Sequence, residues 1–359
     1  MTFDATFLNQ ITLLRRQLHN CAEISGQELQ TRRLLMEFLW QNTTMELFPC
    51  GEGFYAVHRE AEVTKPAIAL RADYDALAMP DGSASHLCGH DGHAAALCGI
   101  ALFLENKMFG RNIFLLFQPA EETGEGAPGC CTLLEQEEIS EIYGLHNLPG
   151  LPLGQVTTRP GTFACASRGL TLQFTGAPTH AAYPENGISP ATAMGELLCR
   201  LPALYDPALF TGMTLCTVIG MNMGEKAFGA AAAAAEVWLT LRAEHDTDLE
   251  KLQDNILSYS QKLAADHNLA FSHQIQDVFP STENTPACAE KVLTLCNGTL
   301  LETPMRWSED FGHYLKKCPG AFFGIGASEA HPPLHTQDYE YPDALLAPSM
   351  EVFLKLIEE

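Results

Sequence analysis

Four short apolar runs recur along the chain and constrain its fold more than any other feature. They are AIALRA (67–72), NIFLLFQ (112–118), EIYGLH (141–146) and AFFGIGA (321–327). Helical stretches such as 92–107 and 286–301 separate them, and 5–43 carries helical periodicity with a break at EISG. Alternating strands and helices are typical of an α/β protein with a doubly wound, mostly parallel sheet that helices cover on both faces.

The segment from Ser167 to about Val278 follows a different pattern. RGLTLQFTG, TLCTVIGMN and EVWLTLRAE predict strands, and 189–204 and 246–266 predict two helices. Two helices on an antiparallel sheet form an α+β domain, so we expect 167–278 to be inserted into a larger domain made of 1–166 and 279–359. The run GAAAAAAE (229–236) is expected to be a loop or tight crossing because it leads directly into a predicted strand.

Composition and charge exclude several classes of protein. The chain has 44 acidic and 21 basic residues, a net charge of −23, which argues against binding nucleic acid or an anionic membrane. The apolar run 94–104 is shorter than the roughly 20 residues of a membrane-spanning helix. The N-terminus has no signal-peptide pattern and the twelve cysteines are scattered, so we expect a cytoplasmic location.

Polar residues follow the predicted strands where each one ends. Asp73 and Asp75 come after the first run, Glu121 and Glu122 follow the second, and His146 ends the third. A histidine-rich stretch, HLCGHDGH (86–93), lies between the first two runs, and one more histidine, in HPPLHTQDY, follows the fourth. Because ligands bind outside the carboxyl ends of the strands in open α/β sheets, these groups are expected to line one crevice.

Crowded carboxylates repel one another and are compensated most simply by a cation. Thiol, imidazole and carboxylate ligands suit zinc or a similar first-row divalent ion. The five candidate ligands are Cys88, His90, Glu122, His146 and His335. A catalytic zinc takes three protein ligands and a water, so this set indicates two ions, roughly 3.5 to 4 Å apart, that share a ligand. Manganese, cobalt and nickel are alternatives to zinc.

The adjacent Glu121 and Glu122 are expected to have different roles. Successive side chains that leave a strand point to opposite sides, so both are not expected to bind the same ion. One can be a ligand while its neighbour takes a proton from a metal-bound water. The expected chemistry is hydrolysis of an amide or ester.

Seven motifs occur in an order that resembles a known family. They are LRADYDAL, CGHDGH, FQPAEE, GLHNLPGLPLGQV, THAAYPENGISP, SEDFGHYLKKCPGAFFGIG and LHTQDY. The chain resembles, over nearly its whole length, the di-metal amidohydrolases of the aminoacylase and carboxypeptidase G type, specifically the indole-acetyl-amino-acid hydrolase branch. The resemblance implies that Glu121 is the general base and that Asp75 orients a ligand from behind. It implies the same five metal ligands, Cys88, His90, Glu122, His146 and His335.

The resemblance also implies roles for the inserted domain, as a lid that mediates a homodimer. His180 is then expected to reach the neighbouring subunit's site and polarise the substrate carbonyl, although a histidine in a Gly/Pro turn is more often simply exposed. Relatives carry an Asn-Val-Ile-Pro run in the lid, and here Phe228 or Gly229 stands at the asparagine. Arg242 is an alternative partner for a substrate carboxylate, although a strand-end arginine is more often a surface residue.

Other polar residues near the motifs have simpler interpretations. His86 is expected to be a bystander. Asp91 is expected to cap the helix that follows or to act behind the ligands. His93 is expected to pack or hydrogen-bond behind the site, and Glu125 to be a solvated loop acid. His331 is the rival of His335 for the last ligand position and fits the family pattern less well.

The function expected from these features is metal-dependent hydrolysis of the amide between an acyl group and an amino acid, with a small-molecule substrate. A dipeptidase or aminopeptidase of the same superfamily is the first alternative. The second is a metal-binding protein that has lost turnover, which the altered lid sequence would explain.

Overall fold

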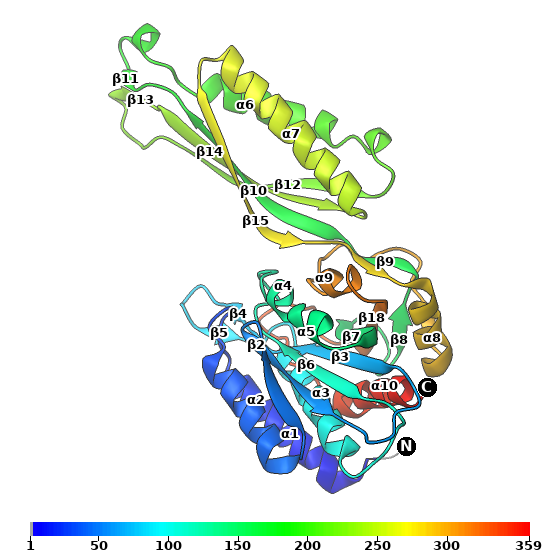
Figure 1. Cartoon of the computed structure of the whole chain (residues 1–359). Coiled ribbons are helices and arrows are strands. Elements are labelled where there is room, and N and C mark those ends of the chain that lie inside the picture. Colours follow the sequence, from blue (N-terminus) through cyan, green and yellow to red (C-terminus); the bar gives the residue numbers. More distant parts are fainter. Residues whose placement is uncertain (1–2) are drawn as a thin grey trace. The chain divides into compact units, whose positions relative to one another are not determined.

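The computed structural model describes residues 3–359, and the chain divides into two compact units (Figure 1). The larger unit contains the chain up to Phe163 together with Thr282–Pro304 and Glu309–Glu359. The smaller unit contains Ala164–Ser281 and Met305–Ser308. The segment 305–308 groups with the smaller unit because the Cys165 amide donates to the carbonyls of Met305 and Trp307, at 3.0 and 3.2 Å.

An eight-stranded sheet forms the centre of the larger unit. Its strand order is β1 (Glu46–Cys50), β2 (Gly53–His58), β6 (Ile113–Gln118), β3 (Ala67–Asp73), β7 (Ile139–Pro149), β18 (Gly320–Ser328), β8 (Val156–Thr158), β17 (Thr299–Leu300). The four strands predicted from the apolar runs, β6, β3, β7 and β18, are neighbours and run parallel. Antiparallel pairs flank them, β2 with β6 and β18 with β8. The predicted α/β class with a parallel centre is therefore confirmed.

Helices cover the two faces of this sheet unequally (Figure 1). The long helices α1 (Ala5–Asn20), α2 (Leu29–Asn42), α3 (His90–Leu104), α8 (Pro286–Cys296) and α10 (Leu346–Glu358) share one hydrophobic core with the sheet. Alternate β3 residues, Ile68, Leu70 and Ala72, belong to that core. Helix α3 is buried at every residue from His90 to Ala101, which explains its apolar, non-amphipathic sequence.

The opposite face of the sheet carries short helices, α4 (Gly126–Cys130), α5 (Thr132–Gln136) and α9 (Gly312–Leu315) (Figure 1). Short strand pairs complete the larger unit, β4 (Leu77–Ala78) with β5 (Ala84–Ser85), and β9 (Gly161–Ala164) with β16 (Thr282–Asn284). A single 3₁₀ turn, η3 (Asp343–Leu345), precedes α10.

The smaller unit is an antiparallel sheet with two helices on one face. The strand order is β12 (Thr214–Met223), β14 (Ala234–Ala243), β10 (Ala166–Thr175), β15 (Ala270–Phe279), and the helices are α6 (Ala191–Leu204) and α7 (Asp246–Asp266). The predicted α+β architecture is therefore present. Strand β15 was not predicted, because its side chains are almost all exposed and show no alternation of apolar and polar residues.

Short elements complete the smaller unit. β11 (Thr179–His180) pairs with β13 (Ala230–Ala231), and two 3₁₀ turns, η1 (Pro184–Asn186) and η2 (Pro207–Leu209), flank α6. The alanine run was expected to be a loop or tight crossing, and most of it is strand instead. Ala230–Ala231 form β13 and β14 begins at Ala234, so within the run of alanines only Ala232 and Ala233 lie outside a strand. Among the described residues of either unit, no helix has the length and apolar character needed to cross a bilayer.

Candidate metal centre

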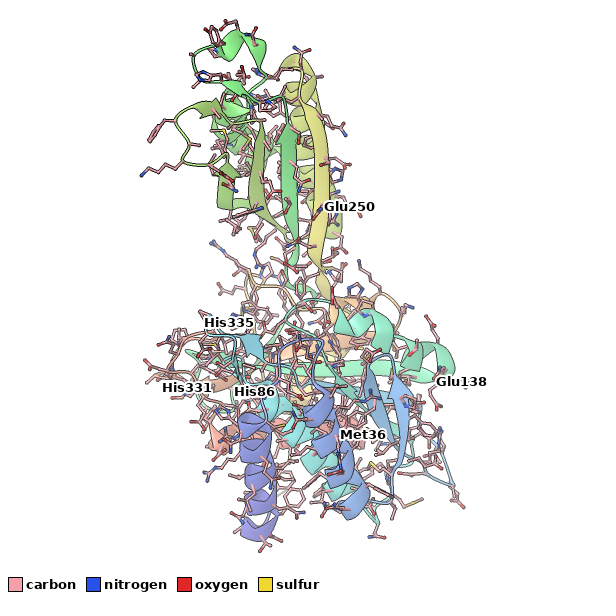
Figure 2. The ribbon with its side chains drawn as sticks, turned by 90° about the vertical axis from the view of Figure 1, so that its left-hand side faces the viewer. Met36, His86, Glu138, Glu250, His331 and His335 are labelled. Carbon is pink, nitrogen blue, oxygen red and sulfur yellow. The ribbon has the colours of Figure 1, made fainter. Side chains whose placement is uncertain are left out.

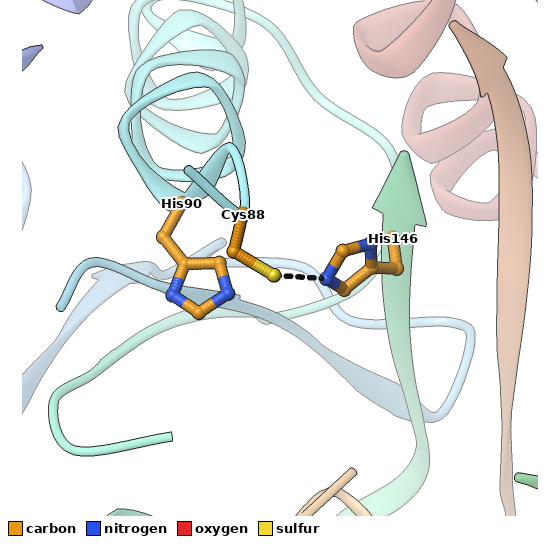
Figure 3. Close-up of side chains that lie close together, drawn as sticks. All are labelled: Cys88, His90 and His146. Carbon is orange, nitrogen blue, oxygen red and sulfur yellow. Dashed lines mark hydrogen bonds between the residues drawn. The ribbon is translucent and has the colours of Figure 1, made fainter. Parts of the chain in front are cut away.

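The structure brings the five predicted metal ligands together in the larger unit. Cys88 precedes α3, His90 begins α3, Glu122 lies in the turn after β6, His146 lies within β7, and His335 follows β18. The Cys88 Sγ lies 3.3 Å from His146 Nε2 (Figure 3) and also 3.3 Å from His335 Nε2. His335 Nε2 is in turn 3.5 Å from Glu122 Oε1.

The donor atoms form two groups of three that share one sulfur. Cys88, His90 and His146 make up the first group, and Cys88, Glu122 and His335 the second, with all donor atoms within 4.8 Å of one another in each. Figure 3 shows Cys88 between the rings of His90 and His146. Thiol, imidazole and carboxylate donors at this spacing suit a first-row divalent cation.

Two glycines explain why the CGHDGH motif can take its conformation. Gly89 has φ +94°, in the left-handed region, and a Cβ there would lie 2.5 Å from Asn147 Oδ1. A Cβ on Gly92 would lie 2.3 Å from the Tyr341 ring. Both positions therefore require glycine. Gly89 allows the tight turn between Cys88 and His90 at the start of α3, and Gly92 leaves room for the Tyr341 ring.

The turn that carries the two adjacent glutamates corrects one expectation. Glu121 Oε2 and Glu122 Oε1 both lie 3.9 Å from His90 Nε2, so the prediction that they point to opposite sides is wrong. Strand β6 ends at Gln118, and Ala120 has φ +51° in a turn, so the alternation of a strand no longer applies. Both carboxylates therefore face the same imidazole.

Buried acids hold the histidines of the centre. Asp75 Oδ1 lies 2.9 Å from His90 Nδ1, which leaves Nε2 to face the donors, and Asp75 Oδ2 accepts from the Glu122 amide at 3.0 Å. Asp73 Oδ1 lies 2.7 Å from His93 Nδ1, so His93 hydrogen-bonds behind the centre as the sequence predicts. Burial raises the pKa of Asp75, but the charge of His90 and the hydrogen bonds from His90, Glu122 and Ser25 together outweigh it, so the pKa lies below its ordinary value.

The protonation equilibria of the centre are strongly shifted by burial and by its crowded charges. Burial and the charges of Glu122 and Glu121 raise the pKa of the Cys88 thiol well above its usual range. Burial and the charge of Glu309 raise the pKa of Glu121. Burial lowers the pKa of His90, but Asp73 and Asp75 outweigh it and raise the pKa to about 10. Burial also lowers the pKa of His146.

A divalent cation fits the residues of this centre. His90 Nε2 and Glu122 Oε1 are buried and have no hydrogen-bond partner within residues 3–359. A buried polar atom without a partner lowers the stability of the folded state. A cation bound by His90 Nε2 and Glu122 Oε1 would give both atoms a partner and would offset the repulsion between the carboxylates.

Residues with simpler expected roles lie outside the two donor groups. His86 is buried, neither ring nitrogen has a partner in the described part of the chain, and burial lowers its pKa. His331 lies in the same loop as His335 (Figure 2), and its Nε2 is 2.8 Å from the Glu340 carbonyl. Glu125 is exposed.

Asp91 does not cap α3, which corrects one of its two expected roles. The N-cap residue is Gly89, and the Asp91 side chain is buried, where it accepts from Arg15 Nη1 at 3.3 Å. It also lies 2.9 Å from His19 Nδ1. Arg15 and His19 both lie in α1, so the Asp91 carboxylate joins α3 to α1.

The candidate substrate-binding residues belong to the smaller unit. His180 is exposed in β11, and its Nδ1 accepts from the Ala182 amide at 3.0 Å. The Phe228 side chain is 90% exposed. Arg242 Nη1 donates to Ser308 Oγ at 2.9 Å and to the Arg306 carbonyl at 3.1 Å, so this guanidinium binds groups of its own unit.

A fully buried charge cluster beside the centre was missed in the sequence. Arg71 Nη1 donates to Asp73 at 2.6 Å, and Nη2 donates to Glu309 and Asp310, both at 2.9 Å. Glu121 shares a group of oxygens within 4.8 Å with Glu309 and Asp310. The available signal was an arginine inside an apolar strand run, because a buried charge requires a partner.

The α/β sheet and its clustered cysteine, histidine and carboxylate donors define the class of metal-dependent hydrolases. Residues 69–359 match the family model described as Peptidase family M20/M25/M40, and the chain belongs to this family. The family resemblance predicted from the sequence motifs is therefore confirmed.

Curated relatives and solved structures match nearly the whole chain. The chain is 27% identical over 370 residues to N-acetyldiaminopimelate deacetylase of Lacticaseibacillus casei, with 96% of each chain covered. It is 28% identical over 370 residues to IAA-amino acid hydrolase ILR1-like 4 of Arabidopsis thaliana, covering 95% of this chain and 83% of that one. A dinuclear metal binding peptidase of the M20 family from Bacillus subtilis superposes with a TM-score of 0.82 at 23% identity, covering 99% and 98%.

Proposed function

We propose that the protein hydrolyses the amide bond of an N-acyl or aryl-acyl amino acid in a metal-dependent reaction. One observation carries this proposal. Glu121 is not among the five candidate ligands, yet its carboxylate lies 3.9 Å from His90 Nε2, where it can take a proton from a metal-bound water. Relatives named as a deacetylase of an N-acetylated amino acid and as an IAA-amino acid hydrolase support the substrate class.

Two divalent ions are proposed to bind each subunit, zinc or manganese, with cobalt or nickel as alternatives. The sharing of Cys88 by the two donor groups supports two ions, as does the likeness to a dinuclear metal binding peptidase. When bound, the ions supply a Lewis acid for the scissile carbonyl and lower the pKa of a water molecule. The ligands would be Cys88, His90, Glu122, His146 and His335.

The side chains of this protein would supply proton transfer and orientation. Glu121 takes the proton of the attacking water and gives it to the departing amine nitrogen, so the amide becomes an acid and an amine. Asp75 holds His90 by its Nδ1 and keeps Nε2 directed at the donor group. His180 would polarise the substrate carbonyl in the neighbouring subunit, a role that rests on the family resemblance and agrees with its exposed position.

The smaller unit is proposed to act as a lid and to form a homodimer. Its edge strand β12 exposes apolar side chains, with Ile219 62%, Met221 45% and Val218 42% exposed. An exposed apolar edge strand is a surface that pairs with another chain.

A cytoplasmic location is supported by the cysteines, since all twelve are free thiols.

The Glu121→Gln variant tests the proposed reaction. We expect unchanged metal content and about a 10²- to 10⁴-fold loss of kcat on N-acetyl amino acids, because the proton acceptor is lost while the side-chain shape is kept. The measurement is hydrolysis of an acyl amino acid panel by metal-reconstituted protein, with metal analysis in parallel. Full activity in this variant would show that the assigned mechanism is wrong.

The substrate panel also separates the alternatives. Each acetylated amino acid is compared with a dipeptide that has a free amino terminus, and faster cleavage of the dipeptides would identify a peptidase. Hydrolysis that is lost on chelation and restored by a divalent ion would exclude a metal-binding protein without turnover.

A further inference from the structure

The loop between α1 and α2, residues 21–28, hydrogen-bonds to the turn that carries Glu121 and Glu122. Glu28 is buried, with 6% of the residue exposed, and its Oε1 accepts from the Ala120 amide at 2.9 Å. The same oxygen accepts from the Gly26 amide at 2.8 Å, which fixes the carboxylate to its own loop. Glu28 therefore contacts the residue directly before the general base.

The contacted residue is in a conformation that it does not favour by itself. Ala120 has φ +51°, in the left-handed region that disfavours a side chain with a Cβ. Its carbonyl accepts from the Gly126 amide at 3.1 Å and from the Glu125 amide at 3.2 Å, and its own amide donates to Glu28. Such a conformation persists only where its surroundings hold it, and Glu28 supplies the contact on the amide side.

A second carboxylate holds the turn on the other side of Glu121. The Glu122 amide donates to Asp75 Oδ2 at 3.0 Å, and Ser25 Oγ donates to the same oxygen at 2.7 Å. The loop is itself fixed, because the Ala76 amide donates to the Glu23 carbonyl at 3.0 Å. The Ala120 and Glu122 amides, on either side of Glu121, therefore donate to buried carboxylates. The segment 21–28 contains one of these carboxylates, Glu28, and its Ser25 hydrogen-bonds to the other.

We propose that Glu28 is a positioning residue for the metal centre. It holds Ala120 in the left-handed conformation and thereby fixes the carboxylates of Glu121 and Glu122 beside His90. Its effect on catalysis rests on the proposed hydrolytic function, whereas its effect on the Glu122 carboxylate as a metal donor does not. Glu28 acts through the backbone of the turn.

The test compares Glu28→Ala with Glu28→Gln in the cobalt-loaded full chain. Glutamine keeps an oxygen at the same reach that can accept from both amides, whereas alanine removes the acceptor. The exposed acid Glu52, changed to alanine, is the matched control. The measurements are the visible absorption bands of bound Co²⁺, the Co²⁺ dissociation constant, kcat and KM on an N-acetyl amino acid, and the melting temperature.

For Glu28→Ala we expect altered Co²⁺ bands, about a 10- to 100-fold weaker Co²⁺ affinity, and a similar fall in kcat with little change in KM. Glu28→Gln and Glu52→Ala should keep the wild-type bands and affinity. A wild-type spectrum, affinity and kcat in Glu28→Ala would overturn the proposal, as would a folded Glu28→Gln that is as defective as Glu28→Ala.

Failure of the proposed function and failure of a variant to fold can each be distinguished from failure of the positioning role. If wild-type protein hydrolyses no acyl amino acid, the proposed function fails, and the Co²⁺ bands and affinity of the two Glu28 variants still decide the positioning role. If Glu28→Ala does not fold, Glu28→Asp replaces it, because its carboxylate is one methylene too short to reach Ala120. Altered Co²⁺ bands in Glu28→Asp would support the proposal, and wild-type bands would overturn it.

Discussion

At the scale of single residues, the candidate centre depends on which of several similar side chains face one another. His331 and His335 are four positions apart in one loop, and of these two histidines it is His335 whose Nε2 lies 3.3 Å from the Cys88 sulfur. His331 instead lies 2.8 Å from the Glu340 carbonyl. His335 has φ +63°, and its amide donates to the Leu87 carbonyl at 2.8 Å, so the backbone brings this ring to the Cys88 loop.

We expect His335→Ala to lower bound metal by about one ion per subunit, because it removes one of three donors of the second group. The matched His331→Ala variant should keep wild-type metal content, since its ring contacts a carbonyl. Elemental analysis of both purified variants after metal reconstitution is the measurement. Equal metal loss in both variants would contradict the ligand assignment.

At the scale of elements, turns determine where the functional groups point. The chain departs from β6 at Gln118, and the turn that follows directs two successive carboxylates to one imidazole. A side chain also fixes a turn in the smaller unit, where the start of α7 is hydrogen-bonded to the segment before β12. Asp248 Oδ2 accepts from the amides of Thr211 and Gly212 at 3.0 and 2.9 Å, and from Thr211 Oγ1 at 2.7 Å.

We expect Asp248→Asn to destabilise the smaller unit by about 1 to 3 kcal/mol at pH 7, because a charged acceptor of three hydrogen bonds is weakened. Burial raises the pKa of Asp248, but the hydrogen bonds from Gly212 and Thr211 outweigh it and lower the pKa. The stabilisation is thus complete above the unfolded pKa of about 4 and is lost as pH falls through the folded pKa.

Thermal unfolding followed by tryptophan fluorescence measures this effect, because Trp238 and Trp307 both belong to the smaller unit. The exposed Asp254 on the same helix, changed to asparagine, is the control. The difference between wild type and Asp248→Asn should shrink below about pH 4. A difference that grows as pH falls would show that the sign is wrong.

At the scale of the whole molecule, the two units have separate cores and carry different parts of the proposed chemistry. The larger unit holds the donor groups and Glu121, and the smaller unit holds His180 and the exposed edge strand β12. If the lid dimer forms as proposed, a change on this edge strand should also alter activity, because His180 is proposed to act in the neighbouring subunit's site.

We expect Ile219→Glu to convert a dimer to a monomer and to lower hydrolysis by at least about tenfold, because it places a charge in the proposed strand pairing. Sedimentation velocity and kcat/KM are the measurements. Trp40→Glu is the control, since Trp40 is an exposed apolar side chain of the larger unit. A wild-type protein that sediments as a monomer and is fully active would refute the dimer.

The sequence by itself determined the fold class and the family, and it supplied the five candidate ligands that the structure brings together. The four parallel strands were visible because buried strands are short apolar runs, and the candidate ligands were visible because Cys, His and Glu recur after them. Strand β15 was not visible, because an exposed strand lacks that pattern, and its place in the sheet depends on pairing with the distant β10.

Only the tertiary structure decided how the centre is held. Three contacts join segments that are distant in the chain. Cys88 is shared by both donor groups, Glu121 and Glu122 both approach His90, and Glu28 accepts from the Ala120 amide. Sequence periodicity reports on the local backbone, whereas these contacts depend on turns with unusual φ angles and on buried charges that pair across elements. The residues of the centre could be predicted from the sequence, but their mutual orientation required the packed fold.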